Sequence, residues 1–332
     1  MPLNRLVTLC LLLLASVANG AENPLDPVRA MSYLQAVCDI GPRMSGSKGM
    51  KKQRELLSQH FQALSRKVEQ QSFNARHPLS KRREKRRVPM TNLIVRWRPE
   101  LTDRILLCCH YDTRPLPDQD PNPRARKQGV FIGANDGGSG VAVLMELAHH
   151  LNAIDDQLQV GVDLVFFDGE ELVYNDSDPY FLGSTWFAMQ YKELQKRPAP
   201  PYRYLAGVLL DMVGDTQLKL YIEEHSWFWR DTRPVVQSIW AKADELGVKE
   251  FIPRYKREIL DDHIPLRNIG KIPTCDIIDP EYPDAFFGQP GSYWHTESDL
   301  PKHCSGESLA KVGWVVFEWI KDQSPTTLKP KP

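Results

Sequence analysis

The sequence lacks an excess of charge of either sign. Its 332 residues include 42 lysines and arginines and 42 aspartates and glutamates, so the formal net charge is zero. Proteins that bind nucleic acids usually carry a clear excess of basic residues. The composition therefore argues against a nucleic-acid partner or a membrane-surface protein. The hydrophobic share of 42% is ample for a large buried core.

Cysteine is scarce, with six residues in the whole chain. No two of them form a CxxC pair, which argues against a zinc site built from thiolates. Cys10 lies in an N-terminal apolar run, and the other five are Cys38, Cys108, Cys109, Cys275 and Cys304. An odd set in an exported protein predicts at least one free thiol or a bridge to another chain.

Hydrophobic runs of membrane length are missing after the N-terminus. The run LVTLCLLLLASV follows Arg5 and is too short to span a bilayer comfortably. Ala18, Asn19 and Gly20 then supply small residues at the spacing that signal peptidases recognise. We predict a cleaved signal peptide over residues 1–20 and an exported protein without stable membrane insertion; the alternative is an uncleaved anchor.

The remaining residues, 21–332, read as one α/β domain. Residues 27–64 have a helical pattern that GPRMSGSKG interrupts. Apolar strands and amphipathic helices then alternate, which indicates a mixed, mostly parallel sheet flanked by helices on both faces. The basic run 76–89 is expected to be a solvated loop, with a partner-binding patch as the alternative. Strands are expected at 91–97, 103–112, 162–167, 204–213 and 271–279, the first two as neighbours, and helices at 138–151, 184–196, 233–247 and 306–322.

Acidic residues and histidines follow these strands in a regular order. Ligands of parallel α/β sheets bind beyond the carboxyl ends of the strands, so these side chains are expected to converge. A catalytic zinc uses about three nitrogen or oxygen ligands plus a water. Each candidate alone has a simpler explanation, but together they predict a metal site. They are His110 and Asp112 in HYD, Asp136 in a glycine-rich turn, Glu170 and Glu171 in DGEE, Asp211 after VLL, and His295 in YWHT.

The order HxD, ND, DGEE, LLDMVG and WHT resembles the M28 family of zinc-dependent aminopeptidases, and also the glutaminyl cyclases, which share that fold. The resemblance runs from about Asn92 to the C-terminal helix. It implies a zinc exopeptidase-like α/β/α sandwich. It also implies that Asp136, Glu171 and His295 hold zinc, while Glu170 acts as general base and acid.

Two activities are compatible with this resemblance. In a two-metal aminopeptidase, His110 and Asp211 would hold a second zinc. The segment DDHIPL resembles the cyclases instead, and there Asp261 would share hydrogen bonds with Glu170 and Asp211. We therefore expect a one-zinc glutaminyl cyclase that forms pyroglutamate from N-terminal glutamine of peptides or proteins and releases ammonia. Its expected catalytic residues are Glu170, Asp211 and Asp261, and its expected pocket residues are Trp294 and His263.

Several positions depart from the cyclase pattern. Animal cyclases pair the cysteine at the position of Cys109 with a second one, but Val141 stands at that second position, so we expect no such disulfide. The loop after DGEE has Tyr174 and Tyr180 where cyclases have a tryptophan. The zinc aminopeptidase is thus the alternative, and a non-catalytic binding domain on the same scaffold is a remote one. We expect a monomer. The absence of a GxSxG turn after a strand argues against a Ser-His-Asp hydrolase.

Overall fold

The computed structural model describes residues 22–80, 86–175 and 177–327. The predicted signal peptide, residues 1–20, lies outside this range. Within the described residues, no helix is both long enough and apolar enough to span a lipid bilayer.

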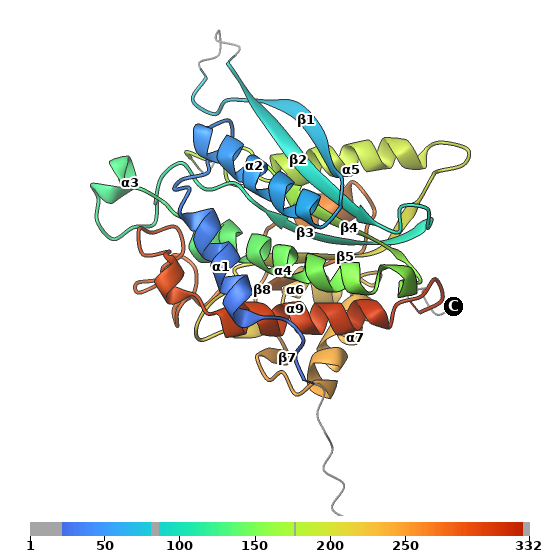
Figure 1. Cartoon of the computed structure of the whole chain (residues 1–332). Coiled ribbons are helices and arrows are strands. Elements are labelled where there is room, and N and C mark those ends of the chain that lie inside the picture. The colour runs from blue at the N-terminus through green and yellow to red at the C-terminus, as the bar shows by residue number, and fades with distance from the viewer. Residues whose placement is uncertain (1–21, 81–85, 176, 328–332) are drawn as a thin grey trace, which may run out of the picture.

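A six-stranded mixed sheet forms the centre of the domain, in the order β1-β2-β4-β3-β5-β8 (Figure 1). Strands β4, β3, β5 and β8 run parallel, whereas β2 pairs antiparallel with both β1 and β4. The predicted mixed, mostly parallel sheet is confirmed. The strands are β1 (Val68–Arg76), β2 (Arg87–Trp97), β3 (Asp103–His110), β4 (Gly161–Phe167), β5 (Arg203–Asp211) and β8 (Thr274–Ile278), with β6 (Leu220–Ile222) and β7 (Phe251–Tyr255) pairing separately.

The strands expected at 91–97 and 103–112 correspond to β2 and β3. The expectation that they are neighbours is wrong, because β4 lies between them. The five-residue link between β2 and β3 is long enough to cross one strand. Arg104 holds this crossing: its buried guanidinium donates to the carbonyl oxygens of Trp97, Arg98 and Leu101 and pairs with Asp163 of β4. Strand β1 was not predicted, since its residues are intermediate or exposed and form no apolar run.

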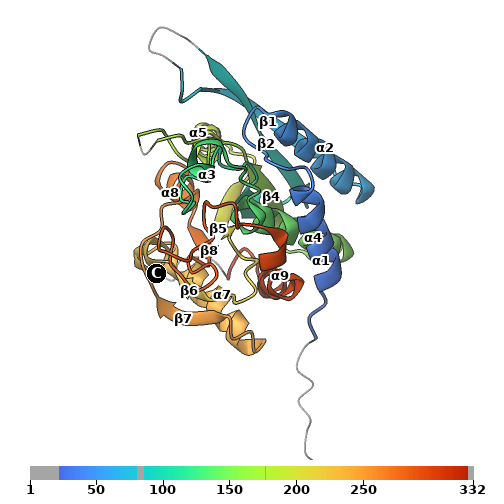
Figure 2. The same cartoon turned by 90° about the vertical axis from the view of Figure 1, so that its left-hand side faces the viewer.

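Helices cover both faces of the sheet (Figures 1 and 2). Alternate residues of β3 separate the two cores, with Leu107 packing among residues of α1, α4, α7 and α9 and Leu106 among residues of α5 and α8. The helices on the first face are α1 (Pro27–Cys38), α2 (Lys48–Ala63), α4 (Gly140–Ala153), α7 (Arg233–Glu245) and α9 (Gly306–Lys321). The helices on the second face are α5 (Leu182–Gln195) and α8 (His263–Asn268). Two further helices are short, α3 (Ala125–Gln128) and α6 (Glu224–Phe228).

The break in the first helical segment has a local cause. Asp26 caps α1 by accepting from the backbone N–H groups of Val28 and Arg29, and Ser47 caps α2 by accepting from Met50 N–H. The segment GPRMSGSKG therefore separates two helices, as predicted, and it carries Arg43 and Ser45 inward to buried positions.

The five cysteines of the described chain, Cys109 among them, are buried and unpaired. The basic run was expected to be a loop over residues 76–89. Its ends belong instead to the β1–β2 hairpin, since β1 ends at Arg76 and β2 begins at Arg87; residues 81–85 lie outside the described chain.

The N-terminal helix is attached to the core through Glu146 of α4. Its buried carboxylate accepts from Asp26 N–H at 2.9 Å and from Arg29 Nε at 2.6 Å, and it lies 3.0 Å from His150 Nε2. Burial alone raises a carboxyl pKa, but His150, Arg29 and the Asp26 N–H outweigh it and lower the pKa of Glu146 to about 2. Because the folded pKa lies below the ordinary value of 4.5, this stabilisation is complete above about pH 4.5 and disappears as the pH falls towards 2.

We predict that Glu146→Gln lowers the free energy of unfolding at pH 7 by about 1–3 kcal/mol, because the variant loses charge-assisted hydrogen bonds. The difference from wild type should shrink between about pH 4.5 and pH 2. Urea unfolding at several pH values measures it. Glu55→Gln is the control, since Glu55 makes only an exposed contact with Lys51 and its loss should not be measurable. Equal effects of both variants would contradict the assignment.

Candidate active site

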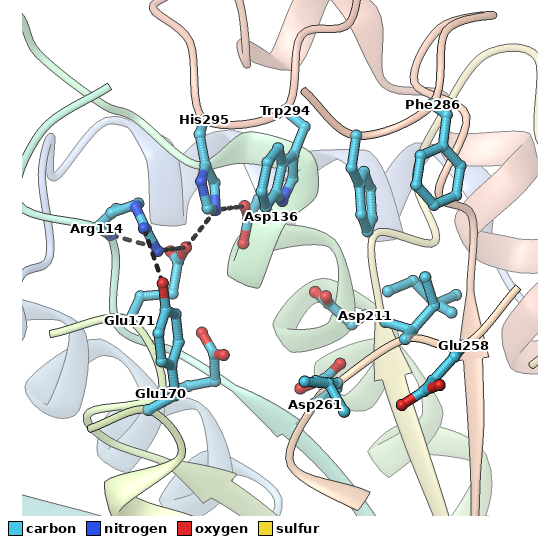
Figure 3. Close-up of a pocket in the computed structure, with 15 residues that line it drawn as sticks. Arg114, Asp136, Glu170, Glu171, Asp211, Glu258, Asp261, Phe286, Trp294 and His295 are labelled. Atoms are coloured by element: carbon cyan, nitrogen blue, oxygen red, sulfur yellow. Dashed lines mark hydrogen bonds and ion pairs between the residues drawn. The ribbon is translucent and has the colours of Figure 1, made fainter. Parts of the chain in front are cut away.

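The carboxyl ends of the parallel strands bring the predicted residues together. Strand β3 ends at His110, β5 ends at Asp211, and DGEE directly follows β4. Because β4, β3 and β5 are adjacent and parallel, these ends lie at one edge of the sheet. Figure 3 shows the side chains of Glu170, Glu171 and Asp211 around one opening.

A tight turn before α4 presents Asp136 to the same opening. Gly137 has a φ of 80°, and a Cβ atom there would lie 2.8 Å from the His110 ring, so only glycine fits. The N–H groups of Asn135 and Asp136 donate to the carboxylate of Asp299 at 2.8 and 3.1 Å. The backbone is thus fixed, and the Asp136 side chain is free to face its neighbours.

Asp136, Glu171 and His295 form a compact set of potential metal ligands. His295 Nε2 lies 2.8 Å from Glu171 Oε1 and 3.4 Å from Asp136 Oδ2. One ligand atom from each residue lies within 4.8 Å of the others, and all three residues are buried. Asp136 Oδ2 accepts no hydrogen bond although it is buried. A histidine nitrogen and two carboxylates, with an unsatisfied oxygen among them, form a donor set that fits zinc.

The adjacent glutamates are separated by the fixed turn that carries them. The two oxygens of the Asp112 carboxylate accept the N–H groups of Glu170 and Glu171, each at 3.1 Å. Glu171 then points to His295, whereas Glu170 faces the opening (Figure 3). Burial raises the pKa of Glu170 well above its ordinary value; His110 opposes the shift, and Glu171 and Asp261 add to it. The two adjacent glutamates therefore have different surroundings, which suit Glu171 to binding a metal and Glu170 to transferring a proton.

A second set of ligand-type atoms lies beside the first. His110 Nε2 is 3.2 Å from Asp136 Oδ1 and 3.2 Å from Asp211 Oδ1. The structure therefore groups the residues that were predicted for a second metal, with Asp136 between the two sets.

Asp261 lies across the opening from Glu170 and next to Asp211 (Figure 3). One of its oxygens accepts the N–H of Asp262 at 2.5 Å, and the other is buried without a hydrogen-bond partner. Burial raises the pKa of Asp261 well above the ordinary aspartate value, and the charge of Asp211 adds to this shift. Two acids so close together in a buried site favour sharing a proton.

The opening is a cavity of about 210 Å³ with an aromatic wall. Trp294 stacks on His295 with ring centroids 3.6 Å apart, and Phe287 stacks on Trp294 at 4.8 Å. The predicted place of Trp294 at the pocket agrees with the structure. The cavity is lined by Arg114, Asp136, Glu170, Glu171, Tyr180, Asp211, Glu258, Ile259, Leu260, Asp261, Ile278, Phe286, Phe287, Trp294 and His295.

The prediction that His263 belongs to the pocket is not met, because His263 does not line this cavity. Its imidazole is fully buried, with Nε2 3.4 Å from Glu223 Oε2 and Nδ1 3.6 Å from Asp276 Oδ2. Residue 263 begins helix α8, which turns its side chain towards the protein interior. Of the two tyrosines after DGEE, Tyr180 lines the cavity, whereas Tyr174 stacks on His77 of the hairpin.

Sequence reasoning missed several residues of the site. Arg114 donates its backbone N–H to Glu171 Oε2 at 3.0 Å, and its guanidinium lies 3.6 Å from Glu171 Oε1. Its position four residues after His110 could have predicted this contact, because a basic side chain near a strand end can pair with the carboxylates gathered there. Phe286, Phe287 and Glu258 come from loops, and no periodicity predicts where these loops run.

The chain is similar in sequence and in fold to several known proteins. The family model described as Peptidase family M28 matches residues 92–320. Glutaminyl-peptide cyclotransferase of Bos taurus is 27% identical over 310 residues, which are 84% of this chain and 77% of that protein. A solved glutaminyl cyclase of Fimbriiglobus ruber is 39% identical with a TM-score of 0.80, over 91% of this chain and 96% of that one. A Zn-dependent exopeptidase of Parabacteroides distasonis is 30% identical with a TM-score of 0.77, over 91% of this chain and all of that one (100%).

The family match covers more than half of the chain and includes Asp136, Glu171 and His295. The sandwich architecture predicted from the sequence is that of these solved structures. The chain belongs to peptidase family M28.

Proposed function

We propose that this protein is a zinc-dependent glutaminyl-peptide cyclotransferase, which converts the N-terminal glutamine of peptides or proteins to pyroglutamate and releases ammonia. The observation that carries the proposal is the buried acid Asp261, which lies next to Asp211 and across the cavity from Glu170, together with the zinc-type ligand set (Figure 3). The similarity to glutaminyl cyclases supports it.

Asp136, Glu171 and His295 would hold the zinc ion, since they combine suitable donor atoms, burial and an unpartnered carboxylate oxygen. When bound there, zinc supplies a Lewis acid that polarises the γ-amide carbonyl of the substrate and stabilises the negative charge that develops on its oxygen.

Glu170 is the residue placed to move the proton. Its carboxylate accepts a proton from the substrate α-amine while the amine nitrogen forms a bond to the γ-carbonyl carbon. It then returns this proton to the amide nitrogen as the carbon–nitrogen bond breaks, so ammonia leaves and the carboxylate is regenerated. Burial keeps the pKa of Glu170 high, which suits a group that must hold a proton briefly.

Asp211 and Asp261 orient Glu170 and the amine from the opposite side. Their buried carboxyl groups line the cavity and offer acceptors for the N–H groups of the substrate. The aromatic wall of Trp294 and Phe287 excludes water from the same side as His295.

The proposal also covers processing, export and oligomeric state. We propose that residues 1–20 are removed as a signal peptide, that residues 21–332 form the exported enzyme, and that it acts as a monomer.

A zinc aminopeptidase is the second candidate, because His110, Asp136 and Asp211 form a group able to take a second ion. In that case Glu170 would activate a water molecule rather than an amine. A solved leucine aminopeptidase precursor of Bacteroides thetaiotaomicron, 28% identical to this chain with a TM-score of 0.77, keeps this candidate open.

We predict that Glu170→Gln lowers the cyclisation rate by about 10²–10⁴-fold while zinc content is unchanged, because the amide cannot take the proton. Glu171→Ala, at the next position, should instead lose the metal. Steady-state rates and zinc analysis of the purified variants measure both. A fully active Glu170→Gln variant would show that the roles are assigned wrongly.

We predict that glutaminyl peptides yield pyroglutamate and ammonia and that leucyl peptides are not cleaved. Mass spectrometry and an ammonia assay on the two matched peptides separate the candidates. Release of free leucine would favour the aminopeptidase.

We further predict one zinc ion per chain, held by Asp136, Glu171 and His295, because the second group of ligand-type residues, His110 and Asp211, shares Asp136 with this set. Elemental analysis of the active protein gives the ratio. Two tightly bound ions per chain would contradict the one-zinc cyclase and support a two-metal site that includes His110.

A further inference from the structure

The imidazole of His295 needs a partner that fixes its orientation. A neutral imidazole carries one proton, so Nε2 can bind a metal only when Nδ1 holds that proton. Nε2 faces Glu171 and Asp136, and the ring is buried. The residue also has a φ of 56°, an uncommon conformation for a side chain of this size that surrounding contacts must maintain.

Asp118 is placed to be that partner. It lies in the long loop between β3 and α4, and its Oδ1 is 3.2 Å from His295 Nδ1. His295 Nδ1 is buried and makes no other hydrogen bond, so this carboxylate oxygen is the acceptor that it faces. The next residue, Gln119, donates its backbone N–H to the carbonyl oxygen of His295 at 3.1 Å. The loop is therefore attached to His295 at two points.

Arg114 extends this contact to a second zinc-type ligand. Its Nε lies 2.6 Å from Asp118 Oδ1, and a second nitrogen lies 3.1 Å from Oδ2. The same guanidinium approaches Glu171, and its side chain is almost completely buried. One carboxylate–guanidinium pair thus contacts both His295 and Glu171.

We propose that Asp118 is a positioning residue for the zinc site: it holds His295 with its proton on Nδ1 and, through Arg114, holds Glu171 in place. This rests on the proposed function, because it assumes that zinc binds these ligands. Asp118 does not line the cavity, so it acts through His295 and not on the substrate. Carboxylates that accept from the second nitrogen of a metal-bound histidine commonly raise metal affinity.

The test is the zinc dissociation constant, measured by competition with a chelating dye. Asp118→Ala should raise this constant by about 10–100-fold. Asp118→Asn should raise it less, because the amide oxygen still accepts the Nδ1 proton. The matched control is Asp103→Asn. Asp103 also pairs with an arginine, with Oδ1 2.6 Å from Arg203 Nε, but at the opposite end of strand β3. It should leave zinc affinity unchanged.

A second readout separates positioning from general stability. The Tm of metal-free Asp118→Ala should stay within about 2 °C of metal-free wild type, because the Asp118 carboxylate is one-third exposed and the buried Arg114 keeps Glu171 as a partner. Unchanged zinc affinity in Asp118→Ala, or a loss matched by Asp103→Asn, would overturn the proposal and leave the cyclase assignment standing. Wild type that binds no zinc would overturn both. A missing cyclase activity with normal zinc binding would contradict only the proposed function.

Discussion

The structure depends on how a dense group of buried carboxylates is neutralised. One small cavity is lined by the carboxylates of Asp136, Glu170, Glu171, Asp211 and Asp261. Among the described residues, the basic side chains in this lining are those of Arg114 and His295. Burying unpaired negative charge costs far more than exposing it. Under the proposed function a zinc ion would offset this cost at Asp136 and Glu171, while Asp211 lies 3.2 Å from His110 and burial raises the pKa of Asp261. This excess of buried negative charge is the physical basis for proposing a cation at the site.

Residues outside the segment that matches the family, 92–320, also hold the site in place. Arg43, in the turn between α1 and α2, is completely buried and donates to the carbonyl oxygens of Ile132 and Gly133, which begin the turn that carries Asp136. Ser45 in the same turn donates to Asp168, the first residue of DGEE. The N-terminal helices are therefore part of the active-site scaffold, and the contact between Glu146 and Arg29 that fixes α1 also fixes this turn indirectly.

The sequence was sufficient to predict that these side chains converge, because strand ends in a parallel sheet share an edge, and the family resemblance named three of them as zinc ligands. Asp136, Glu171 and His295 meet as expected, and Glu170 and Glu171 diverge. It was not sufficient for the positions of β2 and β3 in the sheet, because these depend on tertiary contacts such as the pairing of Arg104 of β3 with Asp163 of β4. It also placed His263 at the pocket, although the start of α8 turns this ring inward. Arg114, Asp118 and the Phe286–Phe287 wall lie on loops, whose paths come from tertiary contacts and not from any hydrophobic period.

The central claim is that one zinc ion binds between Asp136, Glu171 and His295 with Glu170 left uncoordinated. A crystal structure of the protein as purified, with anomalous data collected on both sides of the zinc absorption edge, tests this directly. The account predicts one anomalous peak at about 2.0–2.2 Å from a ligand atom of each of the three residues. A peak bonded to Glu170, or one held by His110 and Asp211 without His295, would contradict it.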